Sequence, residues 1–326
     1  MRAAAAVEAF SRHGGRLSAA AAAFPAAPLP WVDLSTGINP RPYPAPCAER
    51  AARARLPDPE ALRALEAAAA ASFGAPASRV TAVPGSETAI RMLPDLLDVR
   101  RVAIASATYG GHAEAWRAAG AAVVEARDDA EAWVVVNPNN PDGRTTARDE
   151  LLASAARRWT IVDEAFVETA PDLSVAAQAG GRLIVLRSFG KFFGLAGLRL
   201  GFVVADTSVT ARLRARLGDW PLSADAIAAG LAAYADAGWA DRARRRLARD
   251  AVRLDRLLTG AGLEPIGGTS LFRLARTPEA HSVFLRLARA GVLCRPFEAP
   301  DLLRFGLPGR PAEWGRLAAA LAGDRP

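Results

Sequence analysis

Short apolar runs alternate with amphipathic segments through the middle of the chain, and this alternation constrains the fold more than any other feature. The expected strands are 101–105, 122–126, 132–136, 160–163, 183–188 and 201–205, with helices at 112–120 and 147–158. Such an order predicts an α/β fold with a mostly parallel sheet covered by helices on both faces. A ligand site is then expected beyond the carboxyl ends of the strands.

A second, smaller α/β domain is predicted after about Ala237, where the pattern changes. The elements expected there are an arginine-rich helix, a glycine-containing turn at 260–268, a strand at 270–274, a helix at 278–290 and a strand at 292–296. The alanine- and proline-rich start of the chain is interpreted as an arm that folds over this domain. The expected division is an arm at 1–31, a large domain at 32–236 and a small domain at 237–326.

Of the 41 lysine and arginine residues, forty are arginine and one, Lys191, is lysine. A guanidinium stays protonated at physiological pH, whereas a desolvated lysine amine can lose its proton and attack a carbonyl carbon. Lys191 is therefore a candidate nucleophile. Composition alone leaves open that one lysine survived by chance at a neutral position.

The net charge of +7 and the basic stretch 241–256 raise the question of nucleic-acid binding. Apolar residues recur at helical spacing in this stretch, and acidic residues are interspersed, so a solvated amphipathic helix is favoured. We therefore expect no nucleic-acid partner. A positive net charge also attracts an anionic substrate.

The two cysteines, Cys47 and Cys294, lie far apart and lack the spacing of a metal site. No disulfide framework and no bound metal are expected, and a reducing cytoplasm fits. No apolar run approaches the length of a membrane span, and charged residues interrupt the alanine-rich start, so neither a membrane protein nor a signal peptide is predicted.

Lys191 follows an expected strand, with Ser188 three residues before it and Arg199 eight residues after it. The hydroxyl and the guanidinium can hold a cofactor phosphate while the lysine reaches the cofactor aldehyde. The stretch 188–201, SFGKFFGLAGLRLG, resembles the signature of fold-type-I pyridoxal-phosphate enzymes, the aspartate-aminotransferase superfamily. The resemblance implies pyridoxal 5′-phosphate as cofactor and a homodimer whose active sites lie between subunits.

The same resemblance assigns roles to other residues of the expected large domain. Asp163 would pair with the pyridine nitrogen, Asn140 of the loop 137–143 would donate to the phenolic oxygen, and Tyr109 would stack on the ring. Gly85, Ser86 and Glu87 open an apparent helix whose amides are available for the phosphate. Taken alone, these motifs are also typical of a cap, a tight turn, ordinary packing and a plain helix start.

Substrate-binding roles are implied for five more residues, His13, Gly14, Asn39, Arg295 and Arg304. Arg304 resembles the arginine that grips the substrate α-carboxylate, and Arg295 is at a position that contacts a substrate phosphate. His13-Gly14 and Asn39 belong to HGG and D-x-S-x-x-INP segments where an arm closes on a phosphorylated substrate. A flexible turn or a surface arginine is the alternative at each position.

Two groups within the superfamily are similar over nearly the whole chain: histidinol-phosphate aminotransferases and threonine-phosphate decarboxylases. The two N-terminal segments favour decarboxylation, as does Phe166, where aminotransferases of this group usually carry tyrosine. Leu56 also differs from the pattern of the superfamily, since relatives often have at this position a tyrosine that reaches the cofactor phosphate of the neighbouring subunit. Transamination remains the alternative reaction. A regulator would need a helix-turn-helix domain, and a nicotinamide-binding protein a GxGxxG motif, and neither is seen.

Overall fold

The computed structural model describes residues 3–297 and 299–323, and these form two compact units. The larger unit is Pro42–Arg242, and the smaller unit combines the described residues up to Arg41 with those from Ala243 onward. The sequence places the boundaries at 31/32 and 236/237, so both lie further along the chain than expected. One reason is strand β1 (Val32–Asp33), which pairs in parallel with β11 (Val292–Leu293) and so belongs to the smaller unit.

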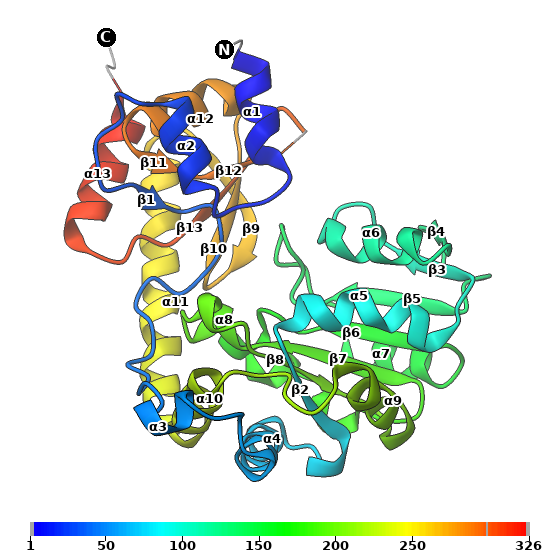
Figure 1. Ribbon diagram of the computed structural model, residues 1–326. Coiled ribbons are helices and arrows are strands. Elements are labelled where there is room, and N and C mark those ends of the chain that lie inside the picture. Colours follow the sequence, from blue (N-terminus) through cyan, green and yellow to red (C-terminus); the bar gives the residue numbers. More distant parts are fainter. Residues whose placement is uncertain (1–2, 298, 324–326) are drawn as a thin grey trace. The chain divides into compact units, whose positions relative to one another are not determined.

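A seven-stranded sheet forms the centre of the larger unit, in the order β2-β8-β7-β6-β5-β3-β4 (Figure 1). Its strands are β2 (Val80–Val83), β3 (Arg101–Ile104), β4 (Ala122–Val124), β5 (Ala132–Val136), β6 (Trp159–Asp163), β7 (Leu183–Ser188) and β8 (Gly201–Val204). Strands β3, β4, β5, β6 and β7 run parallel to one another, whereas β8 runs antiparallel to both β7 and β2. The predicted α/β fold with a mostly parallel sheet is confirmed.

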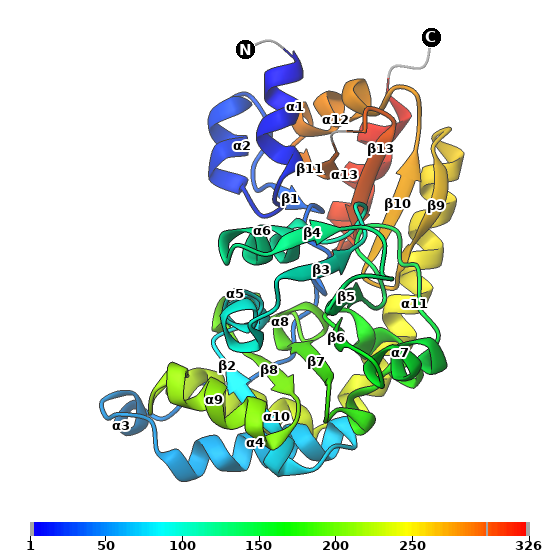
Figure 2. The same ribbon diagram turned by 90° about the vertical axis from the view of Figure 1, so that its right-hand side faces the viewer.

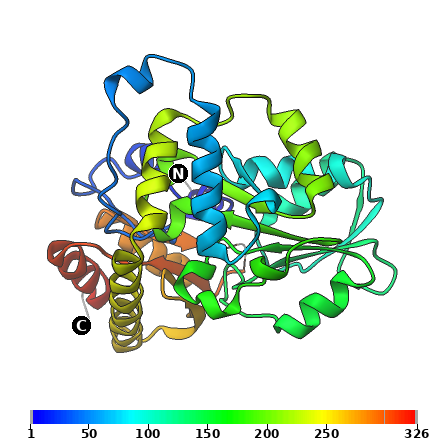
Figure 3. The same ribbon diagram turned by 90° about the horizontal axis from the view of Figure 1, so that it is seen from below.

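Helices cover both faces of this sheet. The helices are α3 (Arg50–Arg53), α4 (Pro59–Phe73), α5 (Ser86–Leu97), α6 (Gly110–Ala118), α7 (Arg148–Ala155), α8 (Phe189–Phe192), α9 (Thr207–Leu217) and α10 (Ala224–Ala235). On one face, Leu93, Trp116 and Leu213 of α5, α6 and α9 join a core with Ile161 and Ile184 of the sheet. On the other face, α4 and α10 lie side by side (Figure 3).

Neighbouring residues of β8 show how the sequence builds these two layers. Val203 belongs to the core beneath α5 and α9. Phe202 points the other way, because successive side chains of a strand alternate between faces, and its ring lies 5.6 Å from Phe73 and 5.5 Å from Tyr234. Fully apolar strands of this kind are typical of a sheet buried on both faces.

The smaller unit contains a four-stranded antiparallel sheet, β12-β13-β10-β9, besides the β1–β11 pair. Its elements are α1 (Ala3–Ser11), α2 (Leu17–Ala23), β9 (Glu264–Thr269), β10 (Phe272–Arg276), α12 (Ala280–Arg289), β12 (Arg295–Pro296), β13 (Leu302–Gly306) and α13 (Pro311–Ala322). Helix α11 (Ala237–Gly260) begins at the end of the larger unit and continues into this one. Phe10 of α1 packs on Phe284 of α12 with ring centroids 5.7 Å apart.

Two expectations for the smaller unit are wrong. The segment 260–268 is a turn only at its start, because strand β9 begins at Glu264 and pairs with β10 (Figure 2). Its glycines serve the hairpin, since a Cβ on Gly268 would lie 2.2 Å from the carbonyl oxygen of Phe272. The expected single strand at 292–296 is two short strands, β11 and β12, which join different sheets.

Among the residues that the structure describes, no helix has the length and apolar character needed to span a membrane. Within the same residues, no group of three or more His, Cys, Asp or Glu side chains is placed to hold a metal ion.

Candidate active site

The carboxyl ends of three parallel strands, β5, β6 and β7, carry four of the predicted cofactor residues: Asn140, Asp163, Ser188 and Lys191. Asp163 is the last residue of β6 and pairs with Leu186 of β7, while Val136, the last residue of β5, pairs with Asp163. The chain continues from β5 into the loop with Asn140, and from β7 into the short helix with Lys191. Register thus gathers at one edge of the sheet residues that lie far apart in the sequence.

Asp163 is buried, and both of its carboxylate oxygens have partners. Oδ1 accepts the Ala165 N–H at 3.0 Å, and Oδ2 lies 2.9 Å from Nε2 of His112, which is also buried. With the proton on Nε2, His112 donates to the carboxylate and keeps it oriented. The sequence reasoning missed His112. Its position three residues after Tyr109, at one turn of α6, is the signal that could have found it.

Tyr109 is held in one orientation at the start of α6. Its hydroxyl donates to Oε2 of Glu87 at 3.0 Å, and burial beside that carboxylate raises the pKa of Tyr109. Gly111 makes room for the ring, because a Cβ there would lie 2.5 Å from it. Glu87 also receives a hydrogen bond from Arg91 at 2.7 Å. In the structure the Glu87 side chain thus orients an aromatic ring, and its cofactor contact stays a prediction.

The turn where β2 leads into α5 packs closely against Arg199. Gly85 adopts a φ of 81°, and a Cβ there would lie 2.6 Å from the Arg199 guanidinium. Arg199 itself has a φ of 52°, which is uncommon for a residue other than glycine and is often found at functional sites. A Cβ on Gly201 would lie 2.5 Å from the Ser86 amide nitrogen, and Gly201 pairs with Ser188. These groups match a phosphate.

The loop that contains Asn140 is fixed by its neighbour Asn139. Asn139 accepts from the Thr108 hydroxyl at 2.6 Å and donates to the Ala107 carbonyl at 2.9 Å and to Asp142 at 2.8 Å. Asp142, which also accepts the Arg144 N–H at 3.0 Å, therefore closes the loop. Asn140 is 8% exposed and so is held within this ordered segment.

Aromatic packing anchors the helix that carries Lys191. Phe189 and Phe193 stack with centroids 4.5 Å apart, and Phe193 stacks on Trp239 at 5.6 Å. Gly190 permits a close turn, since a Cβ there would lie 2.6 Å from Cα of Ala196. Lys191 is half-buried between these fixed neighbours.

In the smaller unit, two predicted substrate arginines are direct neighbours. Arg295 of β12 pairs with Arg304 of β13, so both are on one face of the sheet. Arg304 is buried and donates to the Ser35 carbonyl at 2.7 Å, and Arg295 donates to the Arg12 carbonyl at 2.9 Å. Burial and the charge of Arg295 lower the pKa of Arg304 to about 9, against the effect of Asp33. An anion bound here would stabilise both guanidiniums.

The two N-terminal motifs meet beside these arginines. A Cβ on Gly14 would lie 2.3 Å from the Ser35 carbonyl oxygen, the same oxygen that Arg304 binds. The Gly15 N–H donates to the Ser35 hydroxyl at 2.8 Å, which in turn donates to Asp33 at 2.5 Å. His13 is exposed next to this contact. The structure thus brings His13 and Gly14 to the arginine pair.

The side chain of Asn39 forms hydrogen bonds with two other arginines, Arg41 and Arg246. Its side-chain oxygen accepts the Arg41 N–H at 3.0 Å and a hydrogen bond from Arg246 of α11 at 3.2 Å. It is almost fully buried, at 1% exposure. In the structure Asn39 therefore stabilises the loop after β1, and its substrate role stays a prediction.

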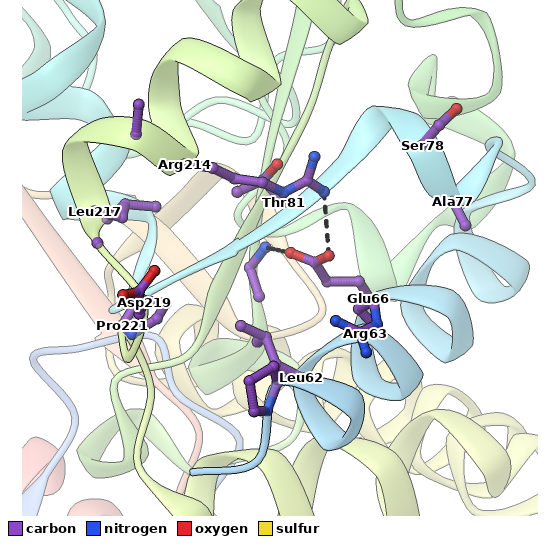
Figure 4. A pocket seen from close by; sticks show the side chains of 14 residues that line it. Leu62, Arg63, Glu66, Ala77, Ser78, Thr81, Arg214, Leu217, Asp219 and Pro221 are labelled. Atoms are coloured by element: carbon purple, nitrogen blue, oxygen red, sulfur yellow. Dashed lines mark hydrogen bonds and ion pairs between the residues drawn. The ribbon is translucent and has the colours of Figure 1, made fainter. Parts of the chain in front are cut away.

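A cavity of about 680 Å³ lies elsewhere in the larger unit, among α4, β2 and α9 (Figure 4). Glu66 accepts the outward-facing Ala82 N–H of edge strand β2 at 2.9 Å and pairs with Arg214 at 3.1 Å. Arg214 also donates to the Val80 carbonyl of that edge at 2.6 Å. None of the predicted site residues lines this cavity, whose ion pair protects an exposed sheet edge.

The chain is similar to known proteins over nearly its whole length. The model of the family Aminotransferase class I and II matches residues 31–323. The chain is 42% identical over 325 residues to a threonine-phosphate decarboxylase of Pseudomonas aeruginosa, covering 95% of this chain and 97% of the relative. It is 44% identical over 326 residues to one of a Sinorhizobium species, with the same coverage.

Among solved structures, the L-threonine-O-3-phosphate decarboxylase of Porphyromonas gingivalis shares the fold with a TM-score of 0.74 and 21% identity, covering 89% of this chain and 98% of that one. The chain belongs to the aminotransferase class I and II family. It is an enzyme whose cofactor is pyridoxal 5′-phosphate, as the sequence predicted.

Proposed function

We propose that the enzyme decarboxylates L-threonine O-3-phosphate to (R)-1-amino-2-propanol O-2-phosphate, a building block of the cobalamin nucleotide loop. The observation that carries this proposal is the pairing of Arg295 with Arg304 beside the His13-Gly14 arm. A substrate with a carboxylate and a phosphate offers one anion to each guanidinium. Similarity to threonine-phosphate decarboxylases over 95% of the chain supports the same substrate.

The larger unit offers groups that fit the cofactor. We propose that Lys191 bonds covalently to it, while Ser188, Arg199 and the amides of Gly85-Ser86 hold its phosphate. Pyridoxal phosphate supplies an electron sink for the electrons that remain when a bond at the substrate α-carbon breaks. Asp163 keeps the ring nitrogen protonated, which strengthens that sink.

Further contacts complete the proposed cofactor site. Asn140 donates a hydrogen bond to the phenolic oxygen of the cofactor. Phe166 has no hydroxyl and so cannot add a second hydrogen bond to that oxygen. Tyr109, held by Glu87, covers the ring face.

Arg304 and Arg295 set which bond at the substrate α-carbon breaks. Arg304 is proposed to bind the carboxylate and Arg295 the phosphate, so that the bond to the carboxylate is aligned for cleavage. Loss of carbon dioxide needs no base, and the α-carbon then takes up a proton. Lys191, released from the cofactor when the substrate amine takes its place, is the proposed donor. In transamination the same lysine would instead remove the α-proton.

We also propose that the enzyme is a cytoplasmic homodimer that acts on a small phosphorylated amino acid. Leu56 and Trp220 expose large apolar side chains, at 66% and 52%, on the surface of the larger unit, which supports self-association. Light scattering tests the dimer, and a monomeric mass at micromolar concentration would contradict it.

The reaction is tested by adding threonine phosphate and cofactor to the purified enzyme and measuring carbon dioxide and aminopropanol phosphate. A parallel incubation with histidinol phosphate tests for conversion of the cofactor to its pyridoxamine form. Stoichiometric carbon dioxide with threonine phosphate supports the proposal. Amino-group transfer without carbon dioxide would replace it with an aminotransferase.

A further inference from the structure

A buried network of charges lies next to the strand ends of the larger unit, and no cofactor or substrate role described above uses it. Arg187 directly precedes Ser188 in β7, and Glu164 directly follows Asp163 at the end of β6. The Arg187 guanidinium donates to Oε2 of Glu164 at 3.0 Å and also to Glu168. All three charged residues are at most 6% exposed.

This network lies on the opposite face of the sheet from the residues it adjoins. Arg187 packs over the ring of Phe73 in α4 at 4.3 Å. Asp163, in contrast, bonds to His112 of α6, which belongs to the other layer. Because successive side chains of a strand alternate, the Ser188 side chain points away from that of Arg187. The buried charges therefore lie on one face of the sheet, and the side chains of Asp163 and Ser188 lie on the other.

The network also determines the path of the segment between β6 and β7. This segment contains only three short 3-10 helices, Val167–Thr169, Pro171–Leu173 and Ala176–Gln178. Glu164 accepts the Val175 N–H at 2.7 Å and the Ser174 hydroxyl at 2.7 Å. Arg187 donates to the same hydroxyl at 3.1 Å. The segment is thus folded around one guanidinium.

Two backbone N–H groups connect the start of this segment to Asp163 and to β7. The Ala165 N–H donates to the Asp163 carboxylate at 3.0 Å, and the Glu164 N–H donates to the Leu186 carbonyl at 2.8 Å. A shift of the Glu164 side chain therefore moves the donor that orients Asp163. A shift of Arg187 changes the backbone that leads into Ser188.

Stability alone is a weak reason to bury such a network, because well-packed apolar residues often replace buried ion pairs without loss. We infer that Arg187, with Glu164 and Glu168, is a positioning network that sets Asp163 against the cofactor ring and Ser188 against the cofactor phosphate. This inference rests on the proposed function. These residues act through their neighbours and touch no reacting atom.

The test compares Glu168→Gln and the milder Ser174→Ala with the control Glu66→Gln. Glu66 is a buried carboxylate of the same unit that is paired with an arginine at the sheet edge (Figure 4). Cofactor affinity of the apoprotein is measured by titrating visible absorbance, along with the pH dependence of that absorbance and the unfolding temperature of the apoprotein. Arg187→Lys tests whether the planar fork is needed or only its charge.

We expect Glu168→Gln to weaken cofactor binding on the order of tenfold and to shift the absorbance titration, with Ser174→Ala in between. Glu66→Gln should leave cofactor affinity within about twofold, because none of the predicted cofactor residues lines the cavity around Glu66. If Glu168→Gln and Glu66→Gln lose cofactor affinity equally, the inference is overturned. If Glu168→Gln does not fold, unchanged cofactor affinity in Ser174→Ala overturns it. A wild-type protein that binds no cofactor overturns the proposed function itself.

Discussion

The two units hold their buried charges in opposite ways. In the larger unit, the Asp163 carboxylate is bonded to His112, and the Arg187 guanidinium is bonded to two carboxylates. In the smaller unit, Arg295 and Arg304 are cross-strand neighbours of like charge, and Asp33 only partly offsets them. The larger unit has thus built its electrostatic balance from its own side chains, as suits a resident cofactor. The proposed substrate of the smaller unit would bring the anionic groups that this pair of arginines can bind.

Lys191→Ala gives the largest expected effect, because it removes the only side-chain amine of the chain. We expect a loss of decarboxylation of roughly a thousandfold or more, as when a covalent nucleophile is removed. Borohydride reduction followed by intact mass measurement should attach cofactor to the wild type and not to the variant. A variant that is still labelled would show that Lys191 is not the attachment site.

Arg304→Gln separates the two units most clearly. Loss of a buried, charge-assisted contact to the substrate should lower kcat/KM for threonine phosphate by about a hundredfold. Cofactor affinity, measured by absorbance titration, should stay the same. Arg304→Lys is the matched control, since it keeps the charge without the planar fork. An equal loss of cofactor and substrate affinity would contradict the division of roles.

His112→Leu tests the balance of the larger unit. Without the hydrogen bond to Asp163, cofactor affinity should fall on the order of tenfold, as for other residues that orient a binding group. KM for the substrate should change little. His112→Gln, which can still donate to the carboxylate, should retain most of the affinity. If the two variants behave alike, the hydrogen bond is not what His112 contributes.

Gly14→Ala probes the arm of the smaller unit. The new methyl would lie 2.3 Å from the Ser35 carbonyl oxygen, so the arm must shift, at a cost of about 1–3 kcal/mol in unfolding free energy. KM should rise a few-fold while cofactor affinity is kept. Gly110→Ala, where no atom lies within 4 Å, is the control and should stay within about 0.5 kcal/mol. Denaturant unfolding and steady-state kinetics measure both.

Glu66→Gln has the smallest expected effect, a change in how the free energy of unfolding depends on pH. Burial raises the pKa of Glu66 above its usual value, against the hydrogen bond from Ala82 and the charge of Arg214. The folded state then holds this proton more tightly than the unfolded state, so its contribution to stability is complete at acidic pH and declines as pH rises through the folded-state pKa. The variant should lack this decline in denaturant unfolding between pH 4 and neutrality. An identical slope in both proteins would contradict it.

Much of the larger unit was predictable because its signals are local. Alternating strands and helices predicted the sheet, and the spacing of Ser188, Lys191 and Arg199 predicted which strand end carries the chemistry. The hairpin of β9 was missed because its glycines, read locally, indicate a turn. Only pairing with β10 shows that they permit close strand contact.

The sequence by itself determined the fold class and, through its resemblance to a known family, the cofactor, and it predicted Lys191 as the nucleophile, since these inferences depend on residue type and short spacing. Only the tertiary structure decided which groups support them. His112 meets Asp163 across 51 residues, Glu164 meets Arg187 across 23, and Arg304 meets the Ser35 carbonyl across 269. Such contacts depend on strand order and register, which bring distant segments together. They produce no short-range pattern in the sequence from which they could be predicted.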